Sequence, residues 1–254
     1  MSGPVLLALC GVGGLFSGVF VNVLVLRGPG KRSFAPPWTR CTRCPHPPSR
    51  TSLLPVAGEL IMDGQCGRCG EAIGWWQPVV EVANAGLWML AASRFGASLE
   101  LLAILPFFSG ILALSVIDLF TYRLPDRINL PLLLGSIPLV VAISLVHHDG
   151  DAIIWAAIGA VSYWLVLGLM WFIHPRGMGY GDVKFVRVLG LYLGWIHPIL
   201  PIYGLMFAGV GGSVAGIAML ATTRDRKKGF PFGPWLAAGC VLAILISPQL
   251  TRGV

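Results

Sequence analysis

The chain has 254 residues, of which 56% are hydrophobic and 11% are charged, and its formal net charge is +7. A soluble domain carries about a quarter charged residues, so this composition excludes an ordinary soluble globular protein. Sixteen of the 18 lysines and arginines lie in four stretches, residues 27–68, 123–127, 176–187 and 224–228. These stretches alternate with loops that hold little positive charge, as the positive-inside rule requires of a membrane protein. The basic excess therefore reports membrane topology and not a nucleic-acid partner.

Apolar runs predict about eight transmembrane helices, because a helix needs about 20 apolar residues to cross a bilayer. In chain order, the expected spans cover residues 5–26, 78–93, 97–117, 128–146 and 152–173, two spans within 188–221, and 230–247. The run 188–221 is too long for one helix, and His197, Pro198 and Pro201 lie where a turn between two spans is needed. The predicted fold class is an all-α polytopic membrane bundle with both termini on the outer side.

Three regions follow from this pattern. Residues 1–27 form the first transmembrane helix, residues 28–77 form a small cytoplasmic domain, and residues 78–254 form a transmembrane helical bundle. The middle region holds four cysteines and several prolines, and it has no apolar run long enough to cross the membrane.

The four cysteines of the middle region form two Cys-x-x-Cys pairs, Cys41 with Cys44 and Cys66 with Cys69. Two such pairs are typical of a tetrahedral structural zinc site. A reducing cytoplasm disfavours a pair of disulfides, although a thiol–disulfide redox function is an alternative. Four thiolates would fill the coordination sphere, so the zinc is expected to build a small fold and to perform no chemistry.

Two aspartates lie at the ends of apolar spans. Asp118 ends the third span, and Asp182 follows the alternating glycines Gly177, Gly179 and Gly181. An ionisable group at such a position costs free energy and is a candidate for function. The span count places both carboxylates on the cytoplasmic side, and the glycines let backbone and water approach Asp182.

Two carboxylates that lie close together cannot both ionise easily, so one pKa rises and the pair holds one proton, as in aspartic proteases. Asp118 and Asp182 are therefore a candidate catalytic pair. The alternative is that both are interfacial residues, solvated at the lipid headgroups or paired with Arg123 and Lys184. Lys184 is first a topology charge and only second a group that tunes the pair.

Other polar residues have simpler explanations. Asp126 follows Pro125 and is expected to be the N-cap of a helix. Glu81 is expected to reach from its span toward the interface. The His147–Asp151 segment is read as a polar turn in an outer loop rather than a metal site.

Several motifs together resemble those of the bacterial type IV prepilin peptidases, which are GxGD-type intramembrane aspartic proteases. The matching residues are Asn22 with Arg27 and Pro29, the four cysteines, Pro78 with Glu81, Asp118 with Leu124-Pro125-Asp126, Gly179-Tyr180-Gly181-Asp182-Val183-Lys184, and Phe230-Pro231-Phe232-Gly233-Pro234. The two aspartate motifs in combination are highly specific for this family.

The resemblance implies that Asp118 and Asp182 are catalytic and that Gly179, Gly181, Lys184 and Asp126 support their motifs. It also implies prepilin or pseudopilin substrates of type IV pili and type II secretion, whose basic leader is removed at the cytoplasmic face of the inner membrane. Many members then methylate the new N-terminus with S-adenosylmethionine. Residues 45–65 lack the tryptophan-rich stretch of the family, and this departure bears on methyl transfer rather than on cleavage.

Two other classes of function remain open from the residues alone. An ion-coupled transporter would use intramembrane aspartates to bind cations, but its carboxylates are expected near the middle of the bilayer. A thiol oxidoreductase would place its cysteines on the oxidising side of the membrane, which is opposite to the side indicated by the distribution of charge.

Overall fold

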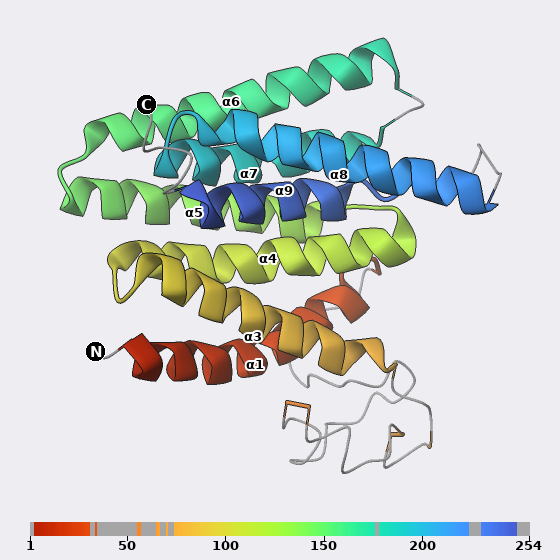
Figure 1. Cartoon of the computed structure of the whole chain (residues 1–254), viewed down its shortest axis with the longest axis horizontal. Coiled ribbons are helices and arrows are strands. Elements are labelled where there is room, and N and C mark those ends of the chain that lie inside the picture. The colour runs from red at the N-terminus through yellow and green to blue at the C-terminus, as the bar shows by residue number, and fades with distance from the viewer. Residues whose placement is uncertain are drawn as a thin grey trace. The chain divides into compact units, whose positions relative to one another are not determined.

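A computed structural model describes residues 3–30, 34, 55–56, 65–66, 70, 74–175, 178–223 and 230–247. Within these residues the regular elements are α1 (Gly3–Arg27), α3 (Trp76–Phe95), α4 (Leu99–Thr121), α5 (Asp126–Val146), α6 (Gly150–Ile173), α7 (Tyr180–Ile196), α8 (Leu200–Thr223) and α9 (Gly233–Leu245) (Figure 1). Each helix falls at one of the predicted spans, which confirms the all-α class. Most of the predicted domain at 28–77 lies outside the described residues.

Five of these helices are long and apolar enough to cross a membrane, namely α1, α4, α5, α6 and α8. The prediction of eight spans is therefore supported for five helices. The helix α7 has 17 residues and α9 has 13, and at about 1.5 Å per residue both are shorter than a hydrocarbon core of about 30 Å. The helix α3 is long enough but less apolar than a membrane span, because it carries Gln77, Glu81 and Asn84.

The apolar run at 188–221 divides into two helices as predicted, although the first of them begins at Tyr180, eight residues before the run. The helix α7 ends at Ile196, and α8 begins at Leu200. His197 has extended backbone angles, with φ −169° and ψ 140°. Pro201 lies in the first turn of α8, where the missing N–H of proline leaves no helical hydrogen bond unmade.

The chain divides into two compact units, Met1–Ala113 and Leu114–Val254. In the first unit, two glycines on one face of α1 let α3 approach closely. A Cβ atom at Gly14 would lie 2.6 Å from Cα of Ala85, and one at Gly18 would lie 2.6 Å from Cα of Glu81. Small residues four apart allow this backbone contact between membrane helices.

Buried polar groups also join the helices of the first unit. Nδ2 of Asn84 donates to the carbonyl of Gly14 at 2.8 Å, and Oδ1 of Asn84 accepts a hydrogen bond from Oγ of Ser109 at 2.9 Å. Nε1 of Trp88 donates to the same Oγ at 2.9 Å. Because each amide and hydroxyl finds a partner, the network links α1, α3 and the first part of α4 without leaving these groups unpaired.

Glu81 is fully buried, with 0% of its surface exposed. Its Oε1 accepts a hydrogen bond from Nδ2 of Asn22 at 3.0 Å, and its Oε2 accepts one from the backbone N–H of Val56 at 2.8 Å. The expectation that Glu81 reaches toward the interface is therefore wrong. The carboxylate instead connects α3 to α1 and to residue 56 of the inserted region.

Replacing Glu81 with leucine should destabilise the protein. The substitution removes the acceptor of the Val56 N–H and one of two acceptors of the Asn22 amide nitrogen, which also donates to the carbonyl of Gln77 at 3.0 Å. Each unsatisfied buried N–H costs about 1–3 kcal/mol. Thermal unfolding in detergent should show a clearly lower melting temperature for Glu81→Leu. The matched control is Glu100→Leu in the first turn of α4, where the carboxylate is only half-buried. Equal melting temperatures for the two variants would contradict this role of Glu81.

In the second unit, α7 is the most buried helix, and twelve of its residues are buried. It packs against α6 through glycines on both sides. A Cβ at Gly190 would lie 2.8 Å from the carbonyl carbon of Gly159, and one at Gly194 would lie 3.0 Å from that of Trp155. The close backbone contact fixes α7 against α6 and so fixes the first turn of α7, which carries Asp182.

Candidate active site

Asp118 lies in the last turn of α4, close to the point where the chain changes direction. The helix ends at Thr121, and Tyr122 has the left-handed value φ 53°. The N–H of Tyr122 donates to the carbonyl of Asp118 at 2.9 Å. A left-handed conformation costs a non-glycine residue about 1–2 kcal/mol, so the surrounding structure holds this turn in place directly after Asp118.

The side chain of Asp118 is 5% exposed and contacts the start of α9. Its Oδ2 accepts a hydrogen bond from the backbone N–H of Gly233 at 3.0 Å. A Cβ at Gly233 would lie 2.8 Å from the same oxygen. Any side chain here would displace the carboxylate, so the glycine preserves this contact.

The motif at 230–234 is present in the sequence prediction, but the role of Gly233 as a donor to Asp118 is not. A glycine immediately before a proline at the start of an apolar span is the only signal for it in the sequence. The partner lies 115 residues away in the chain, so sequence spacing alone does not identify the contact.

Asp182 lies in the first turn of α7 and is 7% exposed. Its Oδ1 is buried and has no hydrogen-bond partner among the described residues. A Cβ at Gly179 would lie 3.4 Å from Oδ2 of Asp182, and one at Gly181 would lie 3.1 Å from Cβ of Leu124. Gly181 thus lets the first turn of α7 approach the Leu124 segment, whereas Gly179 leaves space beside the carboxylate. Gly177 lies outside the described residues.

The two carboxyl groups interact. Asp182 lies outside the five candidate spans; burial raises its pKa, and the Asp118 carboxyl raises it further, to about 7, against an opposing hydrogen bond from the backbone of Gly179. The structure thus brings together the two aspartates that the sequence singles out, which are 64 residues apart in the chain. The alternative that both are solvated at the headgroups is wrong, because both are buried.

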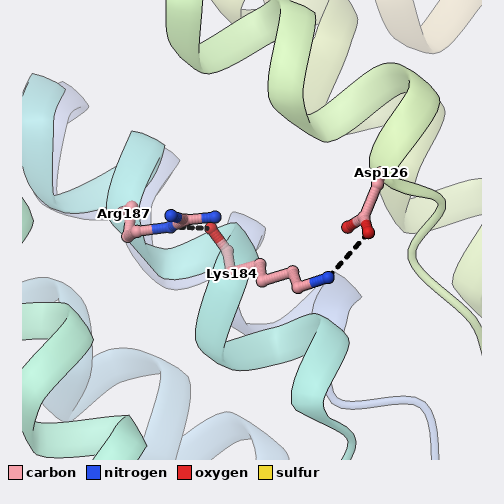
Figure 2. A network of polar contacts seen from close by, with 3 residues as sticks. All are labelled: Asp126, Lys184 and Arg187. Carbon is pink, nitrogen blue, oxygen red and sulfur yellow. Dashed lines mark hydrogen bonds and ion pairs between the residues drawn. The ribbon is translucent and has the colours of Figure 1, made fainter.

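Lys184 pairs with Asp126 and not with either of these aspartates. Its Nζ lies 2.6 Å from Oδ2 of Asp126 (Figure 2), which also rules out Lys184 as the counter-ion in the interfacial alternative. The N-cap of α5 is Pro125, and Asp126 is the first residue of the helix. The expectation that Asp126 is an N-cap is therefore wrong, because its carboxylate is used in an ion pair that joins α5 to α7.

His147 and His148 form a turn before α6, as predicted, whereas Gly150 and Asp151 are the first residues of that helix. Asp149 is the N-cap of α6, and its Oδ1 accepts a hydrogen bond from the N–H of Ala152 at 3.0 Å. The carboxylate therefore satisfies a backbone donor at the start of a helix.

The predicted zinc ligands are described only in part. Cys41, Cys44 and Cys69 lie outside the described residues, and no cluster of three metal-binding side chains occurs within the part that is described. The N–H of Gly70 donates to the carbonyl of Cys66 at 2.8 Å, and Gly70 has the left-handed value φ 68°. This hydrogen bond between Gly70 and Cys66 is compatible with a cysteine knuckle, and the zinc site stays a prediction.

Comparison with known proteins gives an independent result. Residues 12–95 match the model of the bacterial peptidase A24 N-terminal domain, and residues 105–221 match the model of the type IV leader peptidase family. No solved structure matches the chain.

Three relatives are named prepilin leader peptidase/N-methyltransferase. The protein from Pseudomonas putida is 37% identical over 84% of this chain and 74% of its own length, and that from Pseudomonas aeruginosa is 36% identical over 85% and 74%. The protein from Stutzerimonas stutzeri is 32% identical over 98% of this chain and 94% of its own length. The chain belongs to the type IV leader peptidase family.

Proposed function

We propose that this protein is an intramembrane aspartic endopeptidase that removes the leader peptide of a prepilin or pseudopilin, with Asp118 and Asp182 as its catalytic pair. The observation that carries the proposal is the interaction of two buried carboxyl groups from α4 and α7. A pair of this kind activates water in aspartic proteases. The names of the relatives supply the substrate class.

The two carboxyl groups divide the work because their surroundings differ. The N–H of Gly233 stabilises the charged form of Asp118, so Asp118 is the carboxylate that takes a proton from water. Asp182, with a pKa of about 7, holds the shared proton. Its Oδ1, which has no hydrogen-bond partner in the described part of the chain, is placed to contact the scissile carbonyl.

Hydrolysis then follows the general acid–base scheme. The water oxygen attacks the carbonyl carbon as Asp118 accepts the water proton, and Asp182 donates its proton to the carbonyl oxygen. As the C–N bond breaks, the proton on Asp118 passes to the leaving amine, and Asp182 recovers its proton as the new carboxyl group forms.

The position of the pair suits a substrate that enters the membrane. Asp118 is three residues from the end of α4, and Asp182 lies in the first turn of α7. A substrate with a basic leader and an apolar stem places its cleavage point at the interface. We propose the inner membrane as the location and its cytoplasmic face as the catalytic side, because the basic loops adjoin both aspartates.

An ion-coupled transporter is less well supported. Its carboxylates are expected near the middle of the membrane, whereas these two lie at helix ends. The family match also favours a peptidase.

Methyl transfer to the new N-terminus is the second proposed activity, on the strength of the relatives' names. S-adenosylmethionine would supply the methyl group. Among the described residues we assign none to its binding.

Zinc bound by Cys41, Cys44, Cys66 and Cys69 is proposed as a structural element of the inserted domain, and the hydrogen bond from the N–H of Gly70 to the carbonyl of Cys66 supports it. Purified protein should contain one zinc per chain by elemental analysis, and Cys66→Ser should lose it. The control is Cys10→Ser, because Cys10 lies buried in α1. Equal zinc content in the two variants would contradict the assignment.

The activity is tested by incubating the reconstituted protein with a prepilin and measuring substrate mass. We expect release of the leader at a single bond, followed by a mass increase of one methyl group when S-adenosylmethionine is added. An unchanged prepilin mass under conditions that keep the protein folded would contradict the proposed cleavage.

Cleavage should depend on pH because the pair must hold one proton. The folded-state pKa of Asp182 is raised from 3.8 to about 7, so the proton is present below pH 7 and is lost above it. The rate should therefore fall by about tenfold per pH unit well above 7. A flat profile from pH 6 to 9 would contradict a shared proton. Over the window from 3.8 to 7 the folded state binds more protons than the unfolded state, so this group lowers stability as pH rises.

A further inference from the structure

A groove with a volume of about 340 Å³ lies between α5, α6 and α7. Its lining is apolar with one exception, which is Arg187 of α7. Ile137 and Val140 are among the lining residues from α5, and Ala156 and Trp164 are among those from α6. A groove with this lining accepts a hydrocarbon chain.

The groove opens outward. Its floor includes Val140 and Ala156, which are 1% and 2% exposed, whereas its edges include Ile137, Val161 and Trp164, which are 41%, 52% and 43% exposed. Both α5 and α6 are candidate membrane spans. The outward side of the groove is therefore expected to face lipid.

Arg187 is the charged group available at this groove. Lys184, the other basic residue of α7, is neutralised by Asp126 at 2.6 Å. Nε of Arg187 donates to the carbonyl of Lys184 at 3.2 Å (Figure 2). Lys184 lies one turn closer than Arg187 to the end of α7 that carries Asp182. The guanidinium forms no ion pair with a carboxylate of the described residues, and a cation beside lipid needs a counter-ion.

The groove does not lie on the catalytic face of α7. At about 100° per residue, Arg187 is turned about 140° and Leu191 about 180° from Asp182 around the helix axis. A peptide positioned for cleavage at Asp182 would contact another face of α7. The occupant of the groove is therefore a component of the membrane.

We propose that the groove binds one anionic phospholipid, with an acyl chain along α5, α6 and α7 and its phosphate paired with Arg187. A guanidinium binds phosphate oxygens through two parallel hydrogen bonds. A zwitterionic headgroup carries its own cation, which offsets the charge of the phosphate and so weakens this pairing. The site is separate from peptide cleavage and stands whether or not the proposed function holds.

Trp164 provides the readout because it lines the groove. The full chain is reconstituted in vesicles that contain phosphatidylcholine and phosphatidylglycerol, with bromine atoms on the acyl chains of one lipid at a time. The contribution of Trp164 is the difference in fluorescence between the unmodified protein and Trp164→Phe. We expect brominated phosphatidylglycerol to quench this signal more strongly than brominated phosphatidylcholine at equal mole fraction.

The preference for phosphatidylglycerol should fall roughly fivefold in Arg187→Gln, as expected for one basic group at an anionic surface. It should persist in Arg187→Lys and in Arg123→Gln, a charge change on a residue outside the groove. Ala160→Leu, which narrows the groove, should weaken quenching by both lipids and decides the matter if Arg187→Gln does not fold. Any one of three results would overturn the proposal. These are equal quenching by the two lipids in the unmodified protein, equal lipid preference in Arg187→Gln and Arg123→Gln, and unchanged quenching in Ala160→Leu.

Discussion

Asp118→Asn and Asp182→Asn should each reduce leader cleavage by about 10²- to 10⁴-fold, the usual contribution of general acid–base catalysis. An amide cannot accept the water proton in place of Asp118, and it cannot supply the proton that Asp182 donates. Both carboxyls are buried, and burying a charge costs free energy. The neutral amides should therefore leave the melting temperature unchanged or raise it. The measurement is the initial rate of cleavage of a purified prepilin by the reconstituted variants.

The matched control is Asp151→Asn, because Asp151 is an exposed carboxylate at the start of α6. It should cleave at the rate of the unmodified protein. Methyl transfer to a prepilin that has already been cleaved should continue in both catalytic variants, which shows that they insert and fold. Normal cleavage by either Asp118→Asn or Asp182→Asn would remove that residue from the catalytic pair.

Gly233→Ala should lower the cleavage rate by about 10²-fold, the cost of misplacing a catalytic group by about an ångström. The added Cβ would lie 2.8 Å from Oδ2 of Asp118, so the carboxylate must move away and lose the N–H of Gly233. The expected change is in kcat rather than in KM, because no contact to the bulk of the substrate is altered.

Gly209→Ala in α8 is the control, since a Cβ at Gly209 meets no atom within 4 Å. It should cleave normally and melt at the same temperature or slightly higher, because alanine favours a helix over glycine. If Gly233→Ala cleaves as fast as Gly209→Ala, the hydrogen bond to Asp118 does not position the carboxylate.

The helices are predictable from sequence because hydrophobic length and proline positions are local signals. Each of the eight expected spans overlaps one of the helices α1 and α3–α9, and five of these helices are long and apolar enough to cross a membrane. The aspartate pair is also predictable, because a charged residue at the end of an apolar run is costly wherever the rest of the chain lies. The number of helices that cross is less predictable, because α3 keeps its polar residues by burying them against α1.

The errors concern the partners of polar side chains, which depend on tertiary contacts. Asp126 follows a proline and has the local pattern of an N-cap, but an ion pair with Lys184, 58 residues away, determines its role. Glu81 is near the end of a span and could reach water, but Asn22, 59 residues away, holds it inside. Sequence spacing carries no information on either contact.

The central claim is that Asp118 and Asp182 act as one unit, and the double variant Asp118→Asn/Asp182→Asn tests it most directly. When two groups act as a unit, removing either one abolishes their joint contribution to the rate. Removing the second group as well then lowers the rate little further. The cleavage rate of the double variant should equal that of the slower single variant. If the fold losses of the two single variants instead multiply in the double variant, the two carboxylates act independently. That result would contradict a catalytic pair.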